Sequence, residues 1–156
     1  MSSDDRTTIS GIPLKPHYER ADGTAGDEVP GQPPFTRGIF AEGYRQQPWM
    51  ESLACGYGLP EETNQRVRYL AKVGQAGYGG RMSISLVFDR PTFCGLDSDD
   101  PLAESEVGNV GVAVDSLDDM ARLFDGFDLD KLNVGFIVDR SGPMIMAMYI
   151  ALADSL

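Results

Sequence analysis

The chain is poor in positive charge. Its 156 residues include 13 lysines and arginines against 24 aspartates and glutamates, which gives a formal net charge of −11. Binding to phosphate backbones requires clustered Lys and Arg, so this balance argues against a nucleic-acid partner. It argues equally against an anionic membrane surface. The ordinary role of such a charge is to keep a protein in solution.

Cysteine and histidine are scarce as well. The two cysteines, Cys55 and Cys94, lack CxxC spacing, and His17 is the single histidine. This predicts a reduced, cytoplasmic protein without a disulfide framework, and an inert thiol at Cys94, which has no histidine to activate it. No apolar run reaches the 18 residues of a membrane span, and the polar start MSSDDRTTIS is unlike a signal peptide. We predict neither a metal nor a cofactor, and we interpret the acidic loop 97–100 as solvated.

Two apolar runs each end in an Asp-Arg pair. Residues 84–88 (ISLVF) precede Asp89 and Arg90, and residues 134–138 (VGFIV) precede Asp139 and Arg140. Near-unbroken apolar runs of this length predict strands buried on both faces, and Pro91 is expected to end the first one before a polar loop. The carboxyl ends of such strands are where α/β proteins usually place their chemistry.

Residues typical of helix N-termini lie before the first predicted strand and before and after the second. Proline and two acids at 60–62 predict a helix to about residue 73, Ser116 is expected to cap a second helix, and residues 141–143 open a third. Strand, helix, strand, helix predicts a βαβα unit with parallel strands. The final helix is apolar nearly all round, so it needs more cover than two strands provide. Residues 1–37, rich in Pro and Gly, are predicted to be an extended arm, with the α/β domain over 38–156.

Eight short segments occur in one order along nearly the whole chain: 11–16 (GIPLKP), 34–38 (PFTRG), 48–49 (PW), 62–64 (ETN), 88–89 (FD), 91–92 (PT), 97–103 (DSDDPLA) and 106–116 (EVGNVGVAVDS). Together they resemble the N-terminal part of methylmalonyl-CoA mutase and its acyl-CoA mutase relatives. The resemblance implies an arm followed by the first two βα units of a TIM barrel. In that family six more units and a cobalamin domain follow, so we expect a truncated homologue whose partial barrel is completed by oligomerisation.

The chain departs from the family at the substrate wall. Where the family has a substrate-contacting tyrosine this chain has Ala54, and where it has a threonine and an arginine that hold the thioester and CoA it has Met50 and Ser52. A second tyrosine becomes Phe40 and a phosphate-binding arginine becomes Gln47. Losing two cations removes charge-assisted bonds to phosphate, so we expect neither B12-dependent mutase activity nor tight CoA binding. The remodelled, more apolar substrate-binding set is predicted to be Phe40, Gln47, Met50, Ser52, Leu53, Ala54 and Tyr57.

The Asp-Arg pairs are also departures: a family leucine is replaced by Arg90, and a family asparagine region by Asp139 and Arg140. One interpretation is that the pairs are salt bridges that replace lost neighbours. The other is a catalytic set in which Arg90 and Arg140 grip an anion or enolate and Asp89 or Asp139 exchanges a proton.

Two functions follow as hypotheses. The first is a cofactor- and B12-independent isomerase or cyclase of specialised metabolism, which acts on an apolar small molecule. The alternative is a non-catalytic interaction subunit, or the front half of a split acyl-CoA mutase with a mutase-like partner. Exposed strand edges invite pairing, so both hypotheses predict a homodimer or a larger homo-oligomer.

Overall fold

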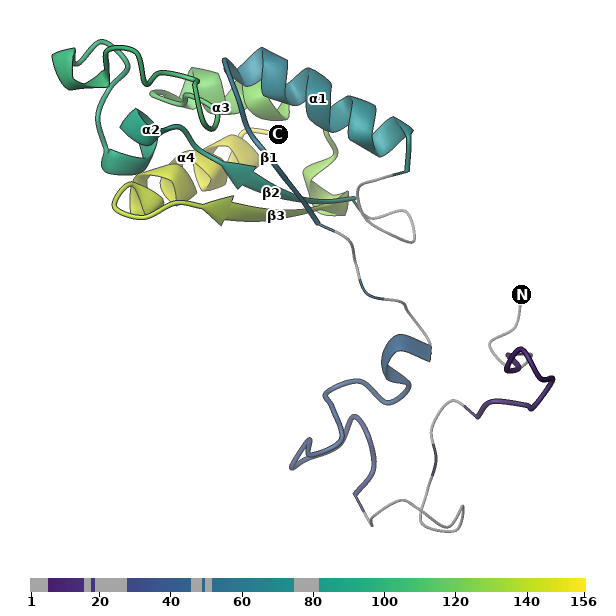
Figure 1. Cartoon of the computed structure of the whole chain (residues 1–156). Coiled ribbons are helices and arrows are strands. Elements are labelled where there is room, and N and C mark those ends of the chain that lie inside the picture. Colours follow the sequence, from purple (N-terminus) through teal and green to yellow (C-terminus); the bar gives the residue numbers. More distant parts are fainter. Residues whose placement is uncertain (1–5, 16–17, 19–27, 46–48, 50–51, 75–81) are drawn as a thin grey trace. The chain divides into compact units, whose positions relative to one another are not determined.

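The computed structural model describes residues 6–15, 18, 28–45, 49, 52–74 and 82–156 (Figure 1). The chain divides into two compact units, Met1–Trp49 and Met50–Leu156. This division lies twelve residues beyond the predicted boundary at residue 37. The described part of the first unit has little regular structure: an isolated antiparallel bridge joins Thr7 to Pro13, and a 3-10 turn, η3, spans Gly43–Arg45.

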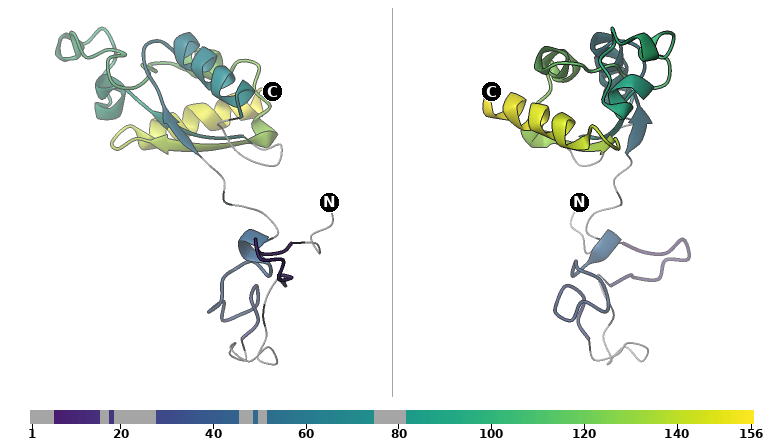
Figure 2. Two further views of the ribbon diagram at one scale, coloured as in Figure 1. Left: turned by 45° about the vertical axis from the view of Figure 1, so that its right-hand side comes forward. Right: turned by 90° about the vertical axis from the view of Figure 1, so that its left-hand side faces the viewer.

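The second unit is an α/β layer with a three-stranded parallel sheet in the order β1-β2-β3. Its helices lie along one side of the sheet, as Figures 1 and 2 show from three directions. The elements in chain order are β1 (Leu53–Cys55), α1 (Pro60–Lys72), β2 (Met82–Val87), α2 (Arg90–Cys94), η4 (Pro101–Ala103), α3 (Leu117–Phe124), η5 (Leu129–Lys131), β3 (Leu132–Ile137) and α4 (Gly142–Asp154).

The predicted parallel βαβα unit is confirmed, together with the starts of its helices. Helix α1 begins at Pro60 and α4 at Gly142. The Ser116 hydroxyl accepts a hydrogen bond from the Asp119 amide, and the Asp119 carboxylate accepts one from the Ser116 amide, which makes a reciprocal capping box. Local sequence therefore sets where these helices begin: a proline lies in the first turn of α1 and of α4, and a serine caps α3.

The structure adds a strand that was not predicted and corrects one local prediction. Residues 53–55 form a third strand, which pairs with β2 from Leu53 opposite Ile84 to Cys55 opposite Leu86; three residues are too few to show an alternating pattern. The chain after β2 does not enter a loop, because Asp89 caps the short helix α2 and Pro91 occupies its first turn, where a missing N–H has no cost.

The core lies between the sheet and the helices. Its buried members are Val67, Ile84, Leu86, Phe88, Val112, Val114, Met120, Leu123, Phe124, Ile145 and Leu152. Each fully buried aliphatic or aromatic side chain contributes roughly 1.5–3 kcal/mol relative to exposure. Rings from three elements meet there: the centroids of Phe136 and Tyr149 are 5.2 Å apart, and those of Phe124 and Tyr149 are 5.1 Å apart. This cluster fixes β3 and α4 against α3.

The opposite side of the sheet, called the open face below, is not covered by helices. Strand β3 alternates strictly, with half-buried Leu132, Val134 and Phe136 on the helix side and exposed residues between them. The prediction of strands buried on both faces was therefore wrong for β3. The register of the three strands gives the open face its members: Ser52, Ala54, Ser83, Ser85, Val87, Asn133, Gly135 and Ile137.

Helix α4 keeps much of its apolar surface in solvent. Ile145 and Leu152 are buried, whereas Met144, Met146 and Ile150 are each about half exposed. The described residues thus leave part of this apolar helix without a packing partner. No helix among them has the length and hydropathy needed to cross a membrane.

Candidate functional site

The carboxyl ends of the three parallel strands meet at one edge of the sheet. This edge carries both Asp-Arg pairs, because β2 runs into Asp89 and β3 runs into Asp139. A further segment lies along it: Val112 forms a parallel bridge with Phe88, and its carbonyl accepts a hydrogen bond of 3.0 Å from the Asp89 amide. The edge is therefore built from segments spread over eighty residues of the chain.

Asp89 is a buried cap. Its side chain is completely inaccessible to solvent (0% exposed). One carboxylate oxygen accepts a hydrogen bond of 2.9 Å from the Thr92 amide, and the other accepts one of 2.7 Å from the Gly108 amide. The first bond caps α2, and the second holds the loop that follows η4 against it. The proton exchange predicted for Asp89 would need an accessible carboxylate, which this geometry does not offer.

The other three members of the predicted catalytic set, Arg90, Asp139 and Arg140, are exposed. Within the described part of the chain none of them forms an ion pair; the ion pairs there join Arg68 to Asp125, Lys131 to Asp128, and Arg122 to carboxylates of α1 and α3. The structure therefore shows no salt bridge within either Asp-Arg pair. Their charged groups are available to a ligand, and their catalytic roles stay predictions.

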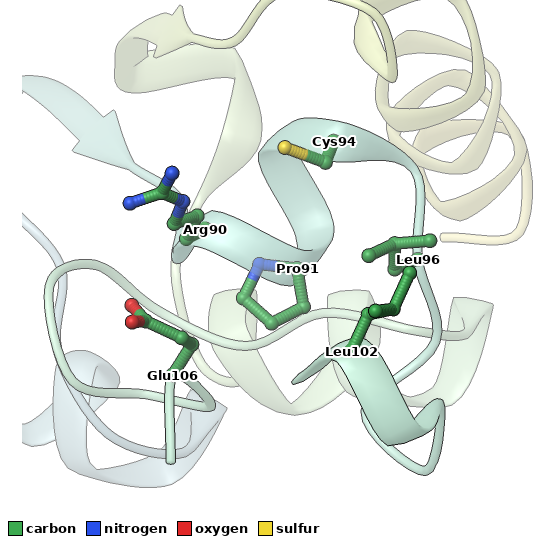
Figure 3. A pocket seen from close by; sticks show the side chains of 6 residues that line it. All are labelled: Arg90, Pro91, Cys94, Leu96, Leu102 and Glu106. Carbon is green, nitrogen blue, oxygen red and sulfur yellow. The ribbon is translucent and has the colours of Figure 1, made fainter. Parts of the chain in front are cut away.

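Arg90 lines a pocket of about 300 Å³ on the helix side of this edge (Figure 3). The pocket is bordered by α2, by the chain that leaves it, and by η4 with the following loop. Its lining residues are Arg90, Pro91, Cys94, Leu96, Leu102 and Glu106. The structure thus places one predicted site residue, Arg90, at a small pocket with both charged and apolar walls.

Within the second unit, the described members of the predicted substrate-binding set do not share one face of the sheet. Ser52 and Ala54 lie on the open face, but Leu53 is opposite core residue Ile84 and belongs to the helix side. Tyr57 follows β1 and is 45% exposed. Phe40 belongs to the first unit, whereas Gln47 and Met50 lie outside the described residues.

The structure adds residues that the sequence interpretation missed. The hydroxyls of Ser52 and Ser85 are 3.1 Å apart, and the Asn133 amide donates a hydrogen bond of 3.2 Å to the Ser83 hydroxyl. A side chain added at Gly135 would approach the Ser85 hydroxyl to 3.3 Å. The signal in the sequence was the alternation of small polar residues with apolar ones in MSISLV and LNVGFI.

The thiols differ in environment. Burial raises the pKa of the Cys55 thiol, and Arg66 only partly offsets this. Cys55 is therefore a protonated thiol at neutral pH, which is a weak nucleophile. Cys94 is exposed at the pocket. No group of three or more His, Cys, Asp or Glu side chains within the described ranges is arranged to hold a metal ion.

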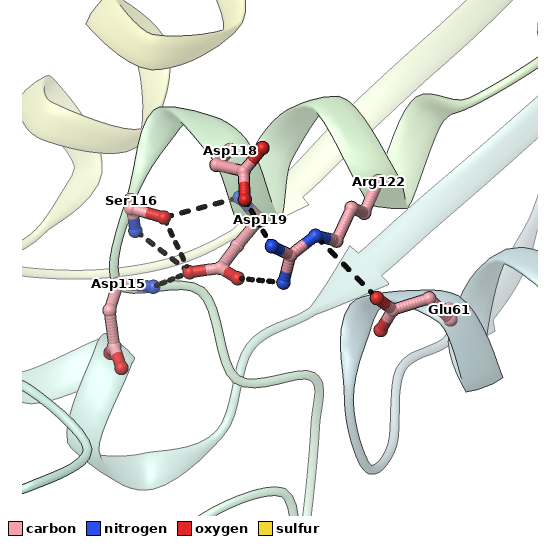
Figure 4. A network of polar contacts seen from close by, with 6 residues as sticks. All are labelled: Glu61, Asp115, Ser116, Asp118, Asp119 and Arg122. Atoms are coloured by element: carbon pink, nitrogen blue, oxygen red, sulfur yellow. Dashed lines mark hydrogen bonds and ion pairs between the residues drawn. The ribbon is translucent and has the colours of Figure 1, made fainter.

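A polar network on the helix layer is structural in character (Figure 4). Arg122 contacts Asp118 and Asp119 on its own helix and Glu61 at the start of α1, with 3.6 Å between the Arg122 and Glu61 groups. All four side chains belong to helices that pack on the sheet, away from the open face. The network therefore ties α3 to α1 and takes no part in the candidate site.

Comparisons with known proteins agree with the fold. The sequence profile of the Methylmalonyl-CoA mutase family matches residues 7–156. Over 151 residues, 94% of this chain, the sequence is 40% identical to the 2-hydroxyisobutanoyl-CoA mutase large subunit of Aquincola tertiaricarbonis, of which it covers 26%. It is also 40% identical, over 94% of its length, to a probable mitochondrial methylmalonyl-CoA mutase of Caenorhabditis elegans, of which it covers 20%. The methylmalonyl-CoA mutase large subunit of Streptomyces virginiae is 38% identical over 94% of this chain and is covered to 20%.

The chain spans about a fifth to a quarter of the length of these relatives. The match nevertheless includes both described units and every strand of the sheet. The chain belongs to the methylmalonyl-CoA mutase family.

Proposed function

We propose that this protein forms the opening segment of an acyl-CoA mutase-type barrel, in which its open face lines the space that holds an acyl thioester. The observation that supports this is a parallel sheet with helices on one side and small polar side chains on the other. In a βα barrel the helices form the outer ring and the uncovered face of each strand points inward. The family match supplies the ligand class, because the similar proteins are named as mutases of CoA thioesters.

The open face is suited to hold an extended, polar chain. The hydroxyls of Ser52 and Ser85 bond to each other, so each can turn to bond an amide or thioester carbonyl instead. Gly135 and Ala54 leave the neighbouring surface low, which lets a thin ligand lie against the strands. Serine, alanine and glycine side chains do not exchange protons near neutral pH. The open face thus binds and orients a ligand rather than reacting with it.

Cobalamin, which the family resemblance implies, needs an imidazole ligand in that family. The chain's single histidine, His17, lies outside the described residues, and these residues offer no other imidazole. The described residues do not fit the role of holding this group, and we derive no step through it. The proposal for this segment is therefore limited to the binding and positioning of a thioester ligand.

The test uses pantetheine, the arm of CoA that ends in the thiol, with binding followed by saturation-transfer NMR on the full chain. We expect millimolar binding that is lost in Gly135→Val, since the new side chain would fill the space next to Ser85. Ser155→Ala, at an exposed serine at the end of α4, is the control and should bind as the wild type does. Equal binding by Gly135→Val and wild type, or no binding by wild type, would refute the proposal.

A second candidate is a cofactor-independent isomerase or cyclase acting on an apolar small molecule. Two exposed arginines that follow adjacent strands favour it: among the described residues neither Arg90 nor Arg140 forms an ion pair, and exposed cations can hold a developing negative charge. If turnover of an apolar acid is unchanged in Arg90→Ala and in Arg140→Ala, this candidate is refuted.

Both candidates leave β1 and β3 with one unpaired edge each among the described strands, so we also propose self-association or a mutase-like partner subunit. A monomeric mass by light scattering at micromolar concentration would contradict self-association.

A further inference from the structure

The pocket at Arg90 is pre-formed, because backbone hydrogen bonds fix every segment that borders it. The Leu96 amide bonds the Pro91 carbonyl at 2.9 Å as the chain leaves α2, and the Leu102 amide bonds the Asp100 carboxylate at 2.8 Å. The Glu106 amide bonds the Ala103 carbonyl at 3.0 Å. A ligand would therefore meet walls that are already in place, which lowers the entropic cost of binding.

The buried Asp89 carboxylate links the two backbone segments that carry the charged lining residues. Asp89 caps α2, whose first residue is Arg90, and it also bonds the Gly108 amide, two residues after Glu106. The backbone segments that carry Arg90 and Glu106 are thereby held at two sides of one pocket. They do not form an ion pair with each other in the described part of the chain. Each charge thus keeps its bonding capacity for a ligand.

Apart from the Cys94 thiol, the rest of the lining is apolar. Leu96 and Leu102 stand opposite the charged groups in Figure 3, with the ring of Pro91 between the two ends. Leu102 is 79% exposed, so much of its aliphatic surface is in contact with water. Covering it with an aliphatic group would remove apolar surface from water. The pocket is therefore dipolar at one end and aliphatic at the other.

We propose that this pocket binds a small aliphatic α-amino acid. The ligand carboxylate bonds the Arg90 guanidinium, the ammonium group bonds the Glu106 carboxylate, and the side chain lies against Leu96 and Leu102. A hydroxy acid would satisfy Arg90 but would offer Glu106 a neutral hydroxyl in place of an ammonium group, so the attraction between two opposite charges at that end of the pocket would be lost. The volume of about 300 Å³ is at the lower end for ligand pockets, which favours a molecule of this size. The pocket shares no residue with the open face, so the inference does not depend on thioester binding there.

The experiment is a titration of the full-length protein with L-leucine, followed by calorimetry or by chemical shifts of the lining residues. We expect millimolar affinity that falls at least tenfold in Arg90→Gln and in Glu106→Gln. Arg140→Gln is the matched control, because Arg140 is also an exposed arginine that follows an aspartate at a strand end but lies outside the pocket. Isovalerate and isopentylamine, which each carry one of the two charges, should each bind at least tenfold more weakly than leucine.

Three results would overturn the proposal: no leucine binding by wild type, full affinity in Arg90→Gln, or an equal loss in Arg140→Gln. Isovalerate or 2-hydroxyisocaproate binding as tightly as leucine would refute the assignment of the ammonium group to Glu106. Pantetheine binding measured on the same variants separates this proposal from the proposed function. It should be unchanged in Arg90→Gln and Glu106→Gln, whereas Gly135→Val should lose pantetheine and keep leucine.

Discussion

The two Asp-Arg pairs allow a direct test of whether burial decides the role of an aspartate. Asp89 and Asp139 both follow a strand and precede an arginine, but Asp89 is fully buried and Asp139 is exposed. The substitution in each case is Asp→Asn, which keeps the size of the side chain and removes one acceptor. The measurement is the free energy of unfolding in urea.

The expected cost at Asp89 comes from its two backbone partners, the amides of Thr92 and Gly108. An asparagine can keep its oxygen on one amide, and as a helix cap it is about as good as aspartate. Its amide nitrogen then faces the other backbone N–H, which is left without an acceptor. An unsatisfied buried donor costs about 1–3 kcal/mol, so we expect a loss of about 2–3 kcal/mol for Asp89→Asn. With a urea dependence of about 1–3 kcal/mol per molar, the midpoint falls by about 0.7–3 M.

Asp139→Asn should change the stability by no more than about 0.5 kcal/mol, as is usual for an exposed position. Hydrogen exchange adds a local measurement, because the Gly108 amide should exchange faster in Asp89→Asn than in wild type. Equal unfolding midpoints for the two variants would refute the assignment of Asp89 as a structural cap.

Three further predictions concern the same unit. Gly111→Ala should cost well over 1 kcal/mol, since φ is +112° there and a Cβ would collide with the backbone of Phe88 and Asp89, just after β2. Gly74→Ala, at φ +74° with open space around it, should cost only the backbone strain. The free energy of unfolding should fall as the pH rises above about 9. Burial raises the pKa values of Cys55 and Tyr149 in the folded chain, so the unfolded chain ionises first. In Cys55→Val and in Tyr149→Phe, urea titrations at pH 8 and 10 should show a smaller difference in unfolding free energy than in wild type. Arg122→Ala should cost less than about 1 kcal/mol in low salt and still less in 1 M NaCl, since its carboxylate partners are on the surface.

The helices were predictable because their signals are local. Proline with two acids starts α1, a serine capping box starts α3, and Gly142-Pro143 starts α4. The long strands were predictable from apolar runs. The strand β1 was not, since Leu53–Cys55 has three residues and gains its hydrogen bonds from β2, thirty residues away.

The candidate site was harder to predict, because it depends on contacts between distant residues. Ser52 is identified as an open-face residue only by its hydrogen bond to Ser85. Leu53 is assigned to the core side because the strand register places it opposite Ile84. A shift of one residue in that pairing would exchange the two faces. Family resemblance placed these residues near a substrate, but it could not say on which side of the strand each one lies.

The contrast between the two aspartates shows why a repeated motif need not repeat a role. Asp89 follows the central strand, and the segment around Val112 lies beside it, so the backbone amide of Gly108 is within reach of its carboxylate. Asp139 follows β3, which has no neighbour on its other side among the described strands. Its carboxylate therefore faces solvent, with no backbone donor to bury it. A strand added at the edge of β3 would bring a new segment beside Asp139, just as β3 and the Val112 segment lie beside β2. A segment that paired with this edge would then decide whether Asp139 is a buried cap, like Asp89, or an exposed carboxylate.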